Sequence, residues 1–92
     1  APGVEVRAFL WNRPGIPEMV LIEESADNRH FTPVAPAMRP GHTGSDYTEF
    51  FITPRNQLKK STRYVRIGVR VSDTSKSWAV QFCGLKMIPE QP

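Results

Sequence analysis

A chain of 92 residues, 39% of them hydrophobic, is long enough for one globular domain with a single core. Its net charge of +3, from 12 Lys and Arg against 9 Asp and Glu, is mild, so a nucleic acid partner is not expected. No apolar run approaches the roughly 20 residues of a membrane-spanning helix, and a single Cys excludes an internal disulfide and a structural zinc site.

The first half of the chain predicts short strands separated by turns. Val4 to Trp11 is the first strand, because its apolar residues alternate: Val4, Val6, Ala8 and Leu10. Segment 12–17 ends it, since its two prolines cannot donate to a sheet ladder. A nearly continuous apolar run, Glu18 to Glu24, predicts a strand covered on both faces. Asp27 and Asn28 predict a turn.

Extended segments and polar loops also alternate in the second half. Phe31 to Ala37 predicts extended chain, although two prolines exclude it from the centre of a sheet. Residues 39–46 predict the longest loop, and Tyr47 to Thr53 predicts another strand. Arg63 to Val71 is the clearest strand, and from residue 65 its apolar side chains recur at every second position: Val65, Ile67, Val69 and Val71. Trp78 to Ile88 predicts the last strand.

Within this last strand, Gly84 predicts a β-bulge that moves the core-facing positions from even to odd residue numbers. Cys83 is expected to be a small buried apolar side chain. Nine prolines and the lack of a 3.6-residue apolar period argue against helices. The sequence therefore predicts an all-β domain, an antiparallel β-sandwich.

Three phrases carry a resemblance to a known family. The first, Val20 to Val34, runs from an apolar strand through Ser-Ala-Asp-Asn to an aromatic residue and a valine. The second is Thr-Arg-Tyr-Val-Arg-Ile at residues 62–67, and the third is Trp-Ala-Val-Gln-Phe-Cys-Gly-Leu-Lys-Met at residues 78–87. In this order the phrases resemble the coagulation-factor type-C (discoidin-like) group. That group includes the family 32 carbohydrate-binding modules, which have the galactose-binding jelly-roll fold.

The resemblance implies a jelly roll of which residues 1–92 are the C-terminal two-thirds. Full members carry further residues on the N-terminal side, ending in a Trp-containing strand, and commonly a terminal disulfide; both are absent here. The chain also begins at Ala1 without a Met. Two interpretations stay open, a shortened relative or a piece of a longer polypeptide, and we expect the second, with residues 1–92 forming a single sandwich domain.

The resemblance also implies a sugar site at loop tips, where a flat aromatic ring covers the C–H surface of a pyranose and polar groups bind its hydroxyls. The candidate ligand-binding residues are Trp11, Asn12, Arg13, His42 and Trp78. Two of them have an alternative role that stays open. Trp11 also suits the core or a sheet edge, with Arg13 in solvent, and Trp78 shares the parity of the core-facing positions of its strand.

The sequence contains no pattern typical of catalysis, so the domain is not expected to be an enzyme. Glu23 and Glu24 are adjacent on a strand and point to opposite faces, so they cannot form an acid–base pair by themselves. No phosphate-binding loop or metal-ligand spacing is present, and no cofactor is expected. A structural Ca²⁺ at Asp27 or Asp46 stays open, although isolated turn aspartates usually cap their own backbone.

These observations lead to the hypothesis of a non-catalytic accessory module that binds carbohydrate, extracellular or secreted, within or alongside a larger enzyme. Its expected partners are a glycan and other domains of the parent polypeptide. Two alternatives remain open. One is a structural or protein-interaction sandwich, fibronectin III-like or discoidin-like, without a sugar site. The other is a binder of acidic polymers that uses Arg66, Arg70 and the Lys59–Lys60 loop.

Overall fold

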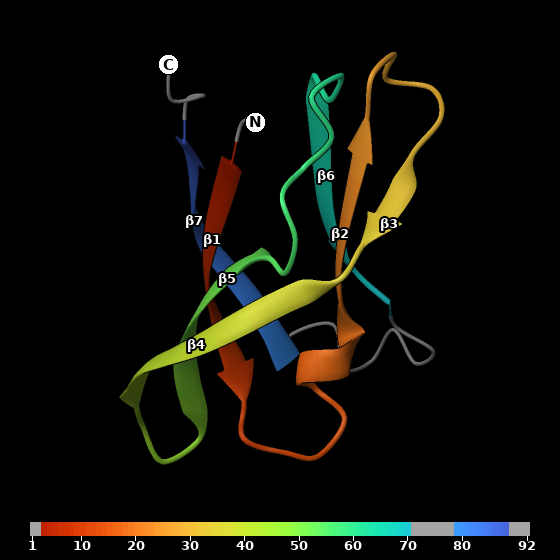
Figure 1. The fold of residues 1–92 in the computed structure, drawn as a ribbon. Helices are drawn as coiled ribbons and strands as arrows, with labels where there is room; N and C mark the ends of the chain where they lie inside the picture. Colours follow the sequence, from red (N-terminus) through yellow and green to blue (C-terminus); the bar gives the residue numbers. More distant parts are fainter. Residues whose placement is uncertain (1–2, 71–78, 89–92) are drawn as a thin grey trace.

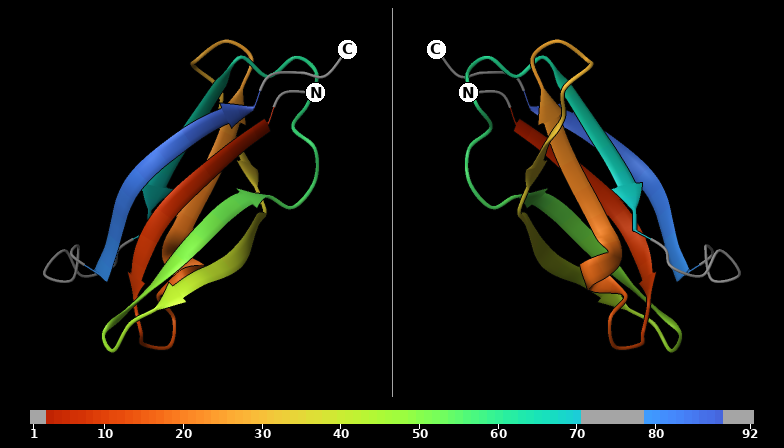
Figure 2. Two further views of the ribbon diagram at one scale, coloured as in Figure 1. Left: turned by 90° about the vertical axis from the view of Figure 1, so that its left-hand side faces the viewer. Right: turned by 90° about the vertical axis from the view of Figure 1, so that its right-hand side faces the viewer.

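The computed structural model describes residues 3–70 and 79–88, which form two antiparallel β-sheets packed face to face (Figures 1 and 2). The elements are β1 (Gly3–Trp11), the 3-10 helix η1 (Pro17–Met19), β2 (Val20–Ser25), β3 (Thr32–Val34), β4 (Pro36–Thr43), β5 (Tyr47–Pro54), β6 (Tyr64–Val69) and β7 (Val80–Ile88). The strand orders are β4-β5-β1-β7 and β3-β2-β6. The predicted all-β antiparallel sandwich is confirmed.

Consecutive strands β1 and β2 lie in different sheets, and segment 12–19 connects the two layers (Figure 1). In the immunoglobulin-type sandwich the first strand lies beside the second. Here β1 lies at the centre of its sheet, between β5 and β7. The strand order therefore differs from the immunoglobulin type.

The core is built around β1. Burial along it alternates as the sequence predicts, and four of its side chains are at most 2% exposed: Val4, Val6, Ala8 and Leu10. They cluster with Ile22 of β2 and Ile52 of β5. Leu58, from the segment between β5 and β6, enters the same cluster and is 3% exposed. The alternation thus directs one face of the central strand into the space between the sheets.

β2 begins at Val20 and not at Glu18, because residues 17–19 form the 3-10 helix. Its burial alternates, with Val20 and Ile22 buried but Leu21 and Glu23 only half-buried. The prediction of a strand covered on both faces is therefore wrong. Among residues 3–70 and 79–88 no strand or helix layer packs on the outer face of the three-stranded sheet, and Leu21 and Glu23 on that face are partly exposed.

A buried carboxylate fixes the segment that carries Leu58. Glu24 is 7% exposed, and its Oε2 accepts hydrogen bonds from the backbone N–H of Lys59 at 3.0 Å and from Thr62 Oγ1 at 2.6 Å. Two donors satisfy the charged group inside the fold. Glu24 thereby connects β2 to the turn that precedes β6.

β6 confirms the clearest strand prediction. It pairs antiparallel with β2, with Ile67 opposite Ile22, so its apolar side chains face the core while Tyr64, Arg66 and Arg70 are exposed. Val71, the last residue of the predicted strand, lies outside the described residues.

Residues 39–43 form the second half of β4, so the prediction of a loop over residues 39–46 is wrong. β4 pairs only with β5 among the described strands, and an edge strand tolerates Pro40, which has no N–H. The register shifts between Pro40 and Thr43. Gly41 lies in this irregularity, where a Cβ would collide with the carboxylate of Glu49.

β7 contains the predicted bulge. Arg7 of β1 lies opposite Gly84 and Ala8 lies opposite Phe82, which leaves Cys83 as the extra residue. Cys83 is exposed, with Sγ 3.3 Å from the backbone O of Arg7, so the prediction of a buried Cys83 is wrong. The bulge turns this side chain away from the core-facing positions.

Candidate functional site

The end of β1 and the β4–β5 hairpin meet at one end of the sandwich, the lower end in Figure 1. Asn12 joins them. Its backbone N–H donates to the O of Asp46 at 2.8 Å, its Nδ2 donates to the O of Gly44 at 3.1 Å, and its Oδ1 accepts from Thr48 Oγ1 at 2.6 Å. The amide of Asn12 is thus engaged within the fold and fixes the two loops side by side.

Trp11 and Arg13 are the chain neighbours of Asn12. Trp11 lies opposite Tyr47 of β5 and is half-buried. The Arg13 guanidinium lies 4.8 Å from the centroid of the Trp11 ring, and Nη1 donates to the O of Asn12 at 2.8 Å. The structure therefore combines an aromatic ring and a cationic hydrogen-bond donor at one loop, the chemistry that sugar recognition needs.

Of the other two sequence candidates, one lies in a strand and the other falls outside the described residues. His42 lies in strand β4, not in a loop as expected, because residues 39–43 pair with β5. Its backbone N–H donates to Glu49 Oε1 at 3.1 Å, and the residue is exposed. Trp78 and the Ser72 to Ser77 loop lie outside the described residues.

An ion pair that the sequence analysis missed lies on the outer face of the four-stranded sheet. Arg7 Nε donates to Glu49 Oε2, while the N–H of His42 donates to the other carboxylate oxygen. The His42 N–H and then the Arg7 guanidinium lower the pKa of Glu49, and Glu49 raises the pKa of Arg7. Glu49 therefore stays ionised and links three strands through its two oxygens.

Arginines also stack on aromatic rings of this sheet. The guanidinium-to-centroid distances are 5.2, 4.8 and 4.4 Å for Arg7 over Phe9, Arg13 over Trp11 and Arg39 over Phe51. The sequence signal was the set of charged and then aromatic residues at odd positions of the first strand: Glu5, Arg7, Phe9 and Trp11. The pairing of that strand with β5 was needed to place Phe51 on the same face.

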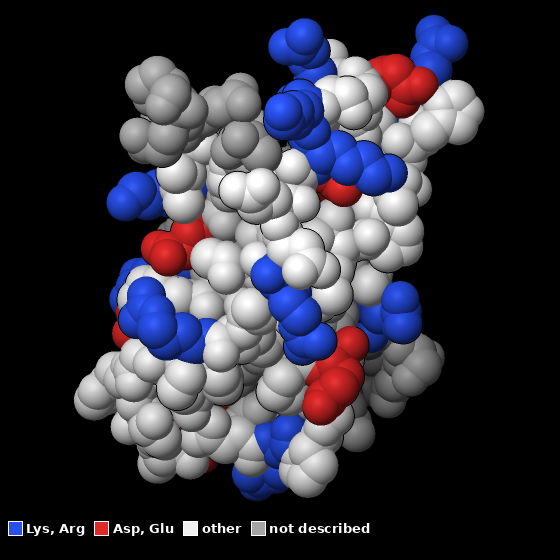
Figure 3. Space-filling model, in the orientation of Figure 1, with Lys and Arg blue, Asp and Glu red and all other residues white. Residues whose placement is uncertain are grey.

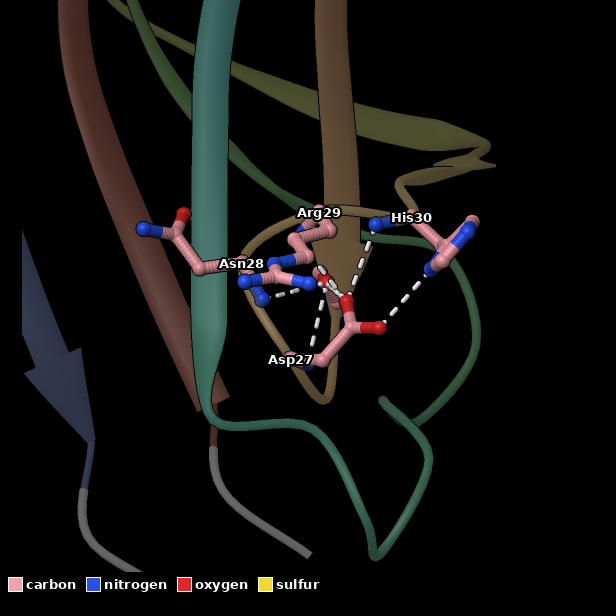
Figure 4. Close-up of polar contacts among 5 residues, drawn as sticks. Asp27, Asn28, Arg29 and His30 are labelled. Atoms are coloured by element: carbon pink, nitrogen blue, oxygen red, sulfur yellow. Dashed lines mark hydrogen bonds and ion pairs between the residues drawn. The ribbon is translucent and has the colours of Figure 1, made fainter.

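A self-contained turn lies at the other end of the molecule (Figure 4). Asp27 Oδ1 accepts from the backbone N–H groups of Arg29 at 2.8 Å and His30 at 2.9 Å, and Oδ2 lies 2.7 Å from His30 Nδ1. The backbone and ring donors of His30, followed by the Arg29 N–H, lower the pKa of Asp27. The hydrogen bond between the His30 ring and the Asp27 carboxylate raises the pKa of His30. Asp27 thus uses its oxygens to hold its own turn, as an aspartate in such a turn commonly does.

Asp27→Asn is expected to lower the pKa of His30 toward its ordinary value of about 6.5. The pKa of His30 is higher in the folded protein than in the unfolded chain. The contact between His30 and Asp27 therefore stabilises the fold fully below the unfolded pKa of His30, and this stabilisation is lost as the pH rises through the folded value. The pKa of Asp27 is lowered, so its contribution is present above its unfolded pKa and is lost as pH falls. The turn is therefore held most firmly between about pH 4 and pH 6.5.

Proton NMR titration of the His30 ring in the wild type and in Asp27→Asn measures this change in the pKa of His30, and His42→Gln is used to assign the signals. An unchanged pKa of His30 in Asp27→Asn contradicts the role given to the carboxylate.

A groove of about 650 Å³ lies between β2 and β3 on one side and the start of β4 on the other. Its apolar lining includes Val20, Ile22, Val34, Ala37 and Met38. Arg55 and Arg70 also line it, and within residues 3–70 and 79–88 neither guanidinium has a carboxylate at ion-pair distance. No local sequence signal marks this groove, because three strands and the segments after β5 and β6 have to come together to form it.

On the face that Figure 3 shows, the basic residues do not form one continuous surface. Arg66, a candidate for acidic polymers, pairs with Glu23 at 3.0 Å, and its guanidinium lies 3.9 Å from the centroid of Phe31. Figure 3 shows Lys and Arg spread over this face, with acidic and uncharged residues between them. A mixed surface of this kind attracts a polyanion less than a continuous basic one.

In the part of the chain that the structure describes, no three His, Cys, Asp or Glu side chains come together as metal ligands, and no helix is long and apolar enough to cross a membrane. A Ca²⁺ at Asp27 would compete with the N–H donors of its own turn. Asp46 directs its backbone O to Asn12. A structural Ca²⁺ stays a prediction.

No protein-family model, no curated protein and no solved structure matches this chain. The discoidin-like resemblance therefore stays an expectation from the sequence, and the function is argued from geometry.

Proposed function

We propose that this chain is a non-catalytic β-sandwich module that binds carbohydrate at the end formed by Trp11, Asn12 and Arg13. The observation that carries the proposal is the half-buried Trp11 ring with the Arg13 guanidinium 4.8 Å from its centroid. Asn12 fixes this pair against the hairpin tip by three hydrogen bonds. A ring and a donor held by a rigid scaffold suit a sugar better than they suit catalysis.

Binding would rest on two contacts. The indole would cover the C–H face of a pyranose, and Arg13 would donate to its hydroxyls. To do so, Arg13 leaves or shares its place over the ring, which costs about 0.5–1 kcal/mol at an exposed site. The site is shallow and a single sugar would bind with a Kd of about 10⁻³ to 10⁻⁴ M, an affinity that rises when the module is tethered to an enzyme.

The setting follows from the discoidin-like resemblance. We propose an extracellular or secreted parent protein in which this module keeps a glycan-active enzyme close to its substrate. Other domains of that polypeptide are then its protein partners. The jelly-roll type of the sandwich belongs to the same proposal.

The test is an array of neutral and acidic sugars probed with the wild type, Trp11→Phe, Trp11→Ala and Arg13→Ala. Trp11→Ala is expected to weaken binding by at least about tenfold, or about 1.4 kcal/mol, and Arg13→Ala by less. Arg29→Ala, an exposed arginine in the Asp27 turn, is the matched control and is expected to bind as the wild type does.

Circular dichroism shows whether each variant folds, and Trp11→Phe keeps an aromatic face should Trp11→Ala unfold. A folded wild type that binds no sugar on the array contradicts the proposal and favours a structural or protein-interaction sandwich.

One observation favours a second candidate, an anionic ligand in the groove. Arg55 and Arg70 line its apolar wall without an ion pair in the described structure. An acidic ligand with an apolar part would use both features. Such binding is expected to fall steeply with salt and with Arg55→Ala and Arg70→Ala, and to be unchanged in Trp11→Ala.

A further inference from the structure

The groove between β2, β3 and β4 lies where the chain passes from one sheet to the other. β3 ends at Val34 and β4 begins at Pro36, so a single residue, Ala35, connects the two layers (Figure 1). Several apolar side chains of the lining are only half-buried and are therefore accessible to a ligand: Leu21, Val34, Ala37 and Met38. A ligand in this groove of about 650 Å³ contacts an apolar wall.

Two arginines and one glutamate give the groove its charge. Arg55 and Arg70 line it and are exposed, and within residues 3–70 and 79–88 neither guanidinium has a carboxylate at ion-pair distance. Among the described residues of the lining, only Glu18 is acidic. The lining therefore has an excess of one positive charge, which a ligand with a single negative charge neutralises.

The backbone at the margin of the groove offers few groups to a peptide. An edge strand accepts a proline whose missing N–H faces away from the ladder, so β3 has no outward donor at Pro33. Pro36, at the start of β4, has no N–H either. Between them, the O of Ala35 already accepts the backbone N–H of Arg55 at 2.7 Å. A peptide that adds to a sheet edge depends on such backbone groups, so this margin favours a ligand held by apolar contact and charge.

We propose that the groove binds a long-chain carboxylate, with its aliphatic chain along the apolar wall and its carboxylate at Arg55 and Arg70. A planar guanidinium matches a carboxylate in a bidentate arrangement, and a monocarboxylate supplies the one negative charge that the lining lacks. This assignment rests on the second candidate function, an anionic ligand in the groove, and gives that ligand its chemical class. It does not depend on the sugar site at Trp11.

The test compares decanoate with hexanoate in ¹⁵N NMR titrations of the 92-residue chain. Both ligands are expected to shift amides of residues 20–22 and 34–38. Each fully buried CH₂ group tightens binding about fourfold, so the four additional groups of decanoate, about half-buried in an open groove, lower the Kd at least about tenfold. Decyltrimethylammonium, which has an alkyl chain of equal length and a positive head, is expected to bind at least about tenfold more weakly than decanoate.

Variants of the lining test the charge. Arg55→Gln and Arg70→Gln are each expected to raise the Kd for decanoate at least about threefold. Ala35→Glu adds a carboxylate at an exposed position of the lining and is expected to raise the Kd at least about tenfold. Arg29→Gln, an exposed arginine outside the lining, is the matched control and should bind decanoate as the wild type does. Circular dichroism shows whether each variant folds.

The outcomes distinguish this ligand from the function on which it rests. Equal Kd values for decanoate and hexanoate, with shifts that Arg70→Gln removes, would leave an anion site and overturn the long-chain ligand. No shift with either carboxylate in folded wild type overturns both. Equal binding of decanoate and decyltrimethylammonium overturns the role of the arginines.

Two further ligands exclude other occupants. Decyl phosphate that bound at least about tenfold more tightly than decanoate would make phosphate the head group. A peptide of about eight residues, in which valine alternates with glutamate, would be the better occupant if it bound more tightly than decanoate by the same factor. Either result overturns the proposed carboxylate.

Discussion

Leu10→Ala is expected to lower the free energy of unfolding by about 3 kcal/mol, within the range of about 2–5 kcal/mol for buried leucines. Leu10 belongs to the core cluster and is 1% exposed, so truncation leaves a cavity that its closely packed neighbours fill only in part. Urea denaturation followed by circular dichroism measures the change in midpoint, provided that the slope is unchanged.

Leu85→Ala is the matched control for this prediction. Leu85 occupies the same core-facing side of the same sheet but is 54% exposed. Its truncation is expected to cost less than about 1 kcal/mol in the chain alone. Equal losses in the two variants would contradict the difference in burial between Leu10 and Leu85.

Glu24→Ala is expected to destabilise the fold by about 2–4 kcal/mol. The change leaves the N–H of Lys59 and the hydroxyl of Thr62 without their acceptor, and hydrogen bonds to a charged group contribute about 1.5–3 kcal/mol each. It also releases the segment that places Leu58 in the core. Denaturant unfolding measures the loss.

Two variants separate this role from a general effect of charge. Glu24→Gln keeps an oxygen where Oε2 accepts both bonds, so it should cost less than Glu24→Ala. Glu23→Ala removes the adjacent carboxylate, whose ion pair with the half-exposed Arg66 is worth about 0–1 kcal/mol. A loss in Glu23→Ala as large as that in Glu24→Ala would show that the two hydrogen bonds to Glu24 are not the cause.

Local sequence patterns predicted the strands in which core-facing and outward side chains alternate along the chain. The alternation along β1 and β6 located one face of each sheet, and Gly84 predicted the bulge that resets β7. Along β1 and β6 every second side chain faces the core, so the period in the sequence and the period in space coincide.

Long-range pairing decided the remaining features. Pro40 and Gly41 resemble loop residues, yet an edge strand accepts both, and β5 recruits them into β4. Cys83 lies in an apolar run but is the extra residue of a bulge, so it points away from the core. The acidic partners of Lys59 and Arg7 are 35 and 42 residues away, beyond the reach of any local pattern.

In the candidate site, too, some residues could be selected from the sequence and others only from the structure. Trp11 and Arg13 were candidates because the discoidin-like resemblance implies a ligand site at the loop that follows the first strand. The role of Asn12 could not be predicted, because Asp46, Gly44 and Thr48 reach it only after the hairpin folds back on β1. The geometry thus gives Asn12 a positioning role, and the ring and the guanidinium are the two groups of the proposed sugar site.

The most direct test of the proposed sugar site is a ¹⁵N NMR titration of the wild type with the sugar that gives the strongest array signal, taken to about 10 mM so that a millimolar Kd is saturated. We expect amide shifts at residues 11–13 and 44–47, together with the Trp11 indole signal, and no shifts at these positions in Trp11→Ala. Shifts confined to the groove around Arg55 and Arg70, or an unchanged spectrum at the highest concentration, would contradict the account.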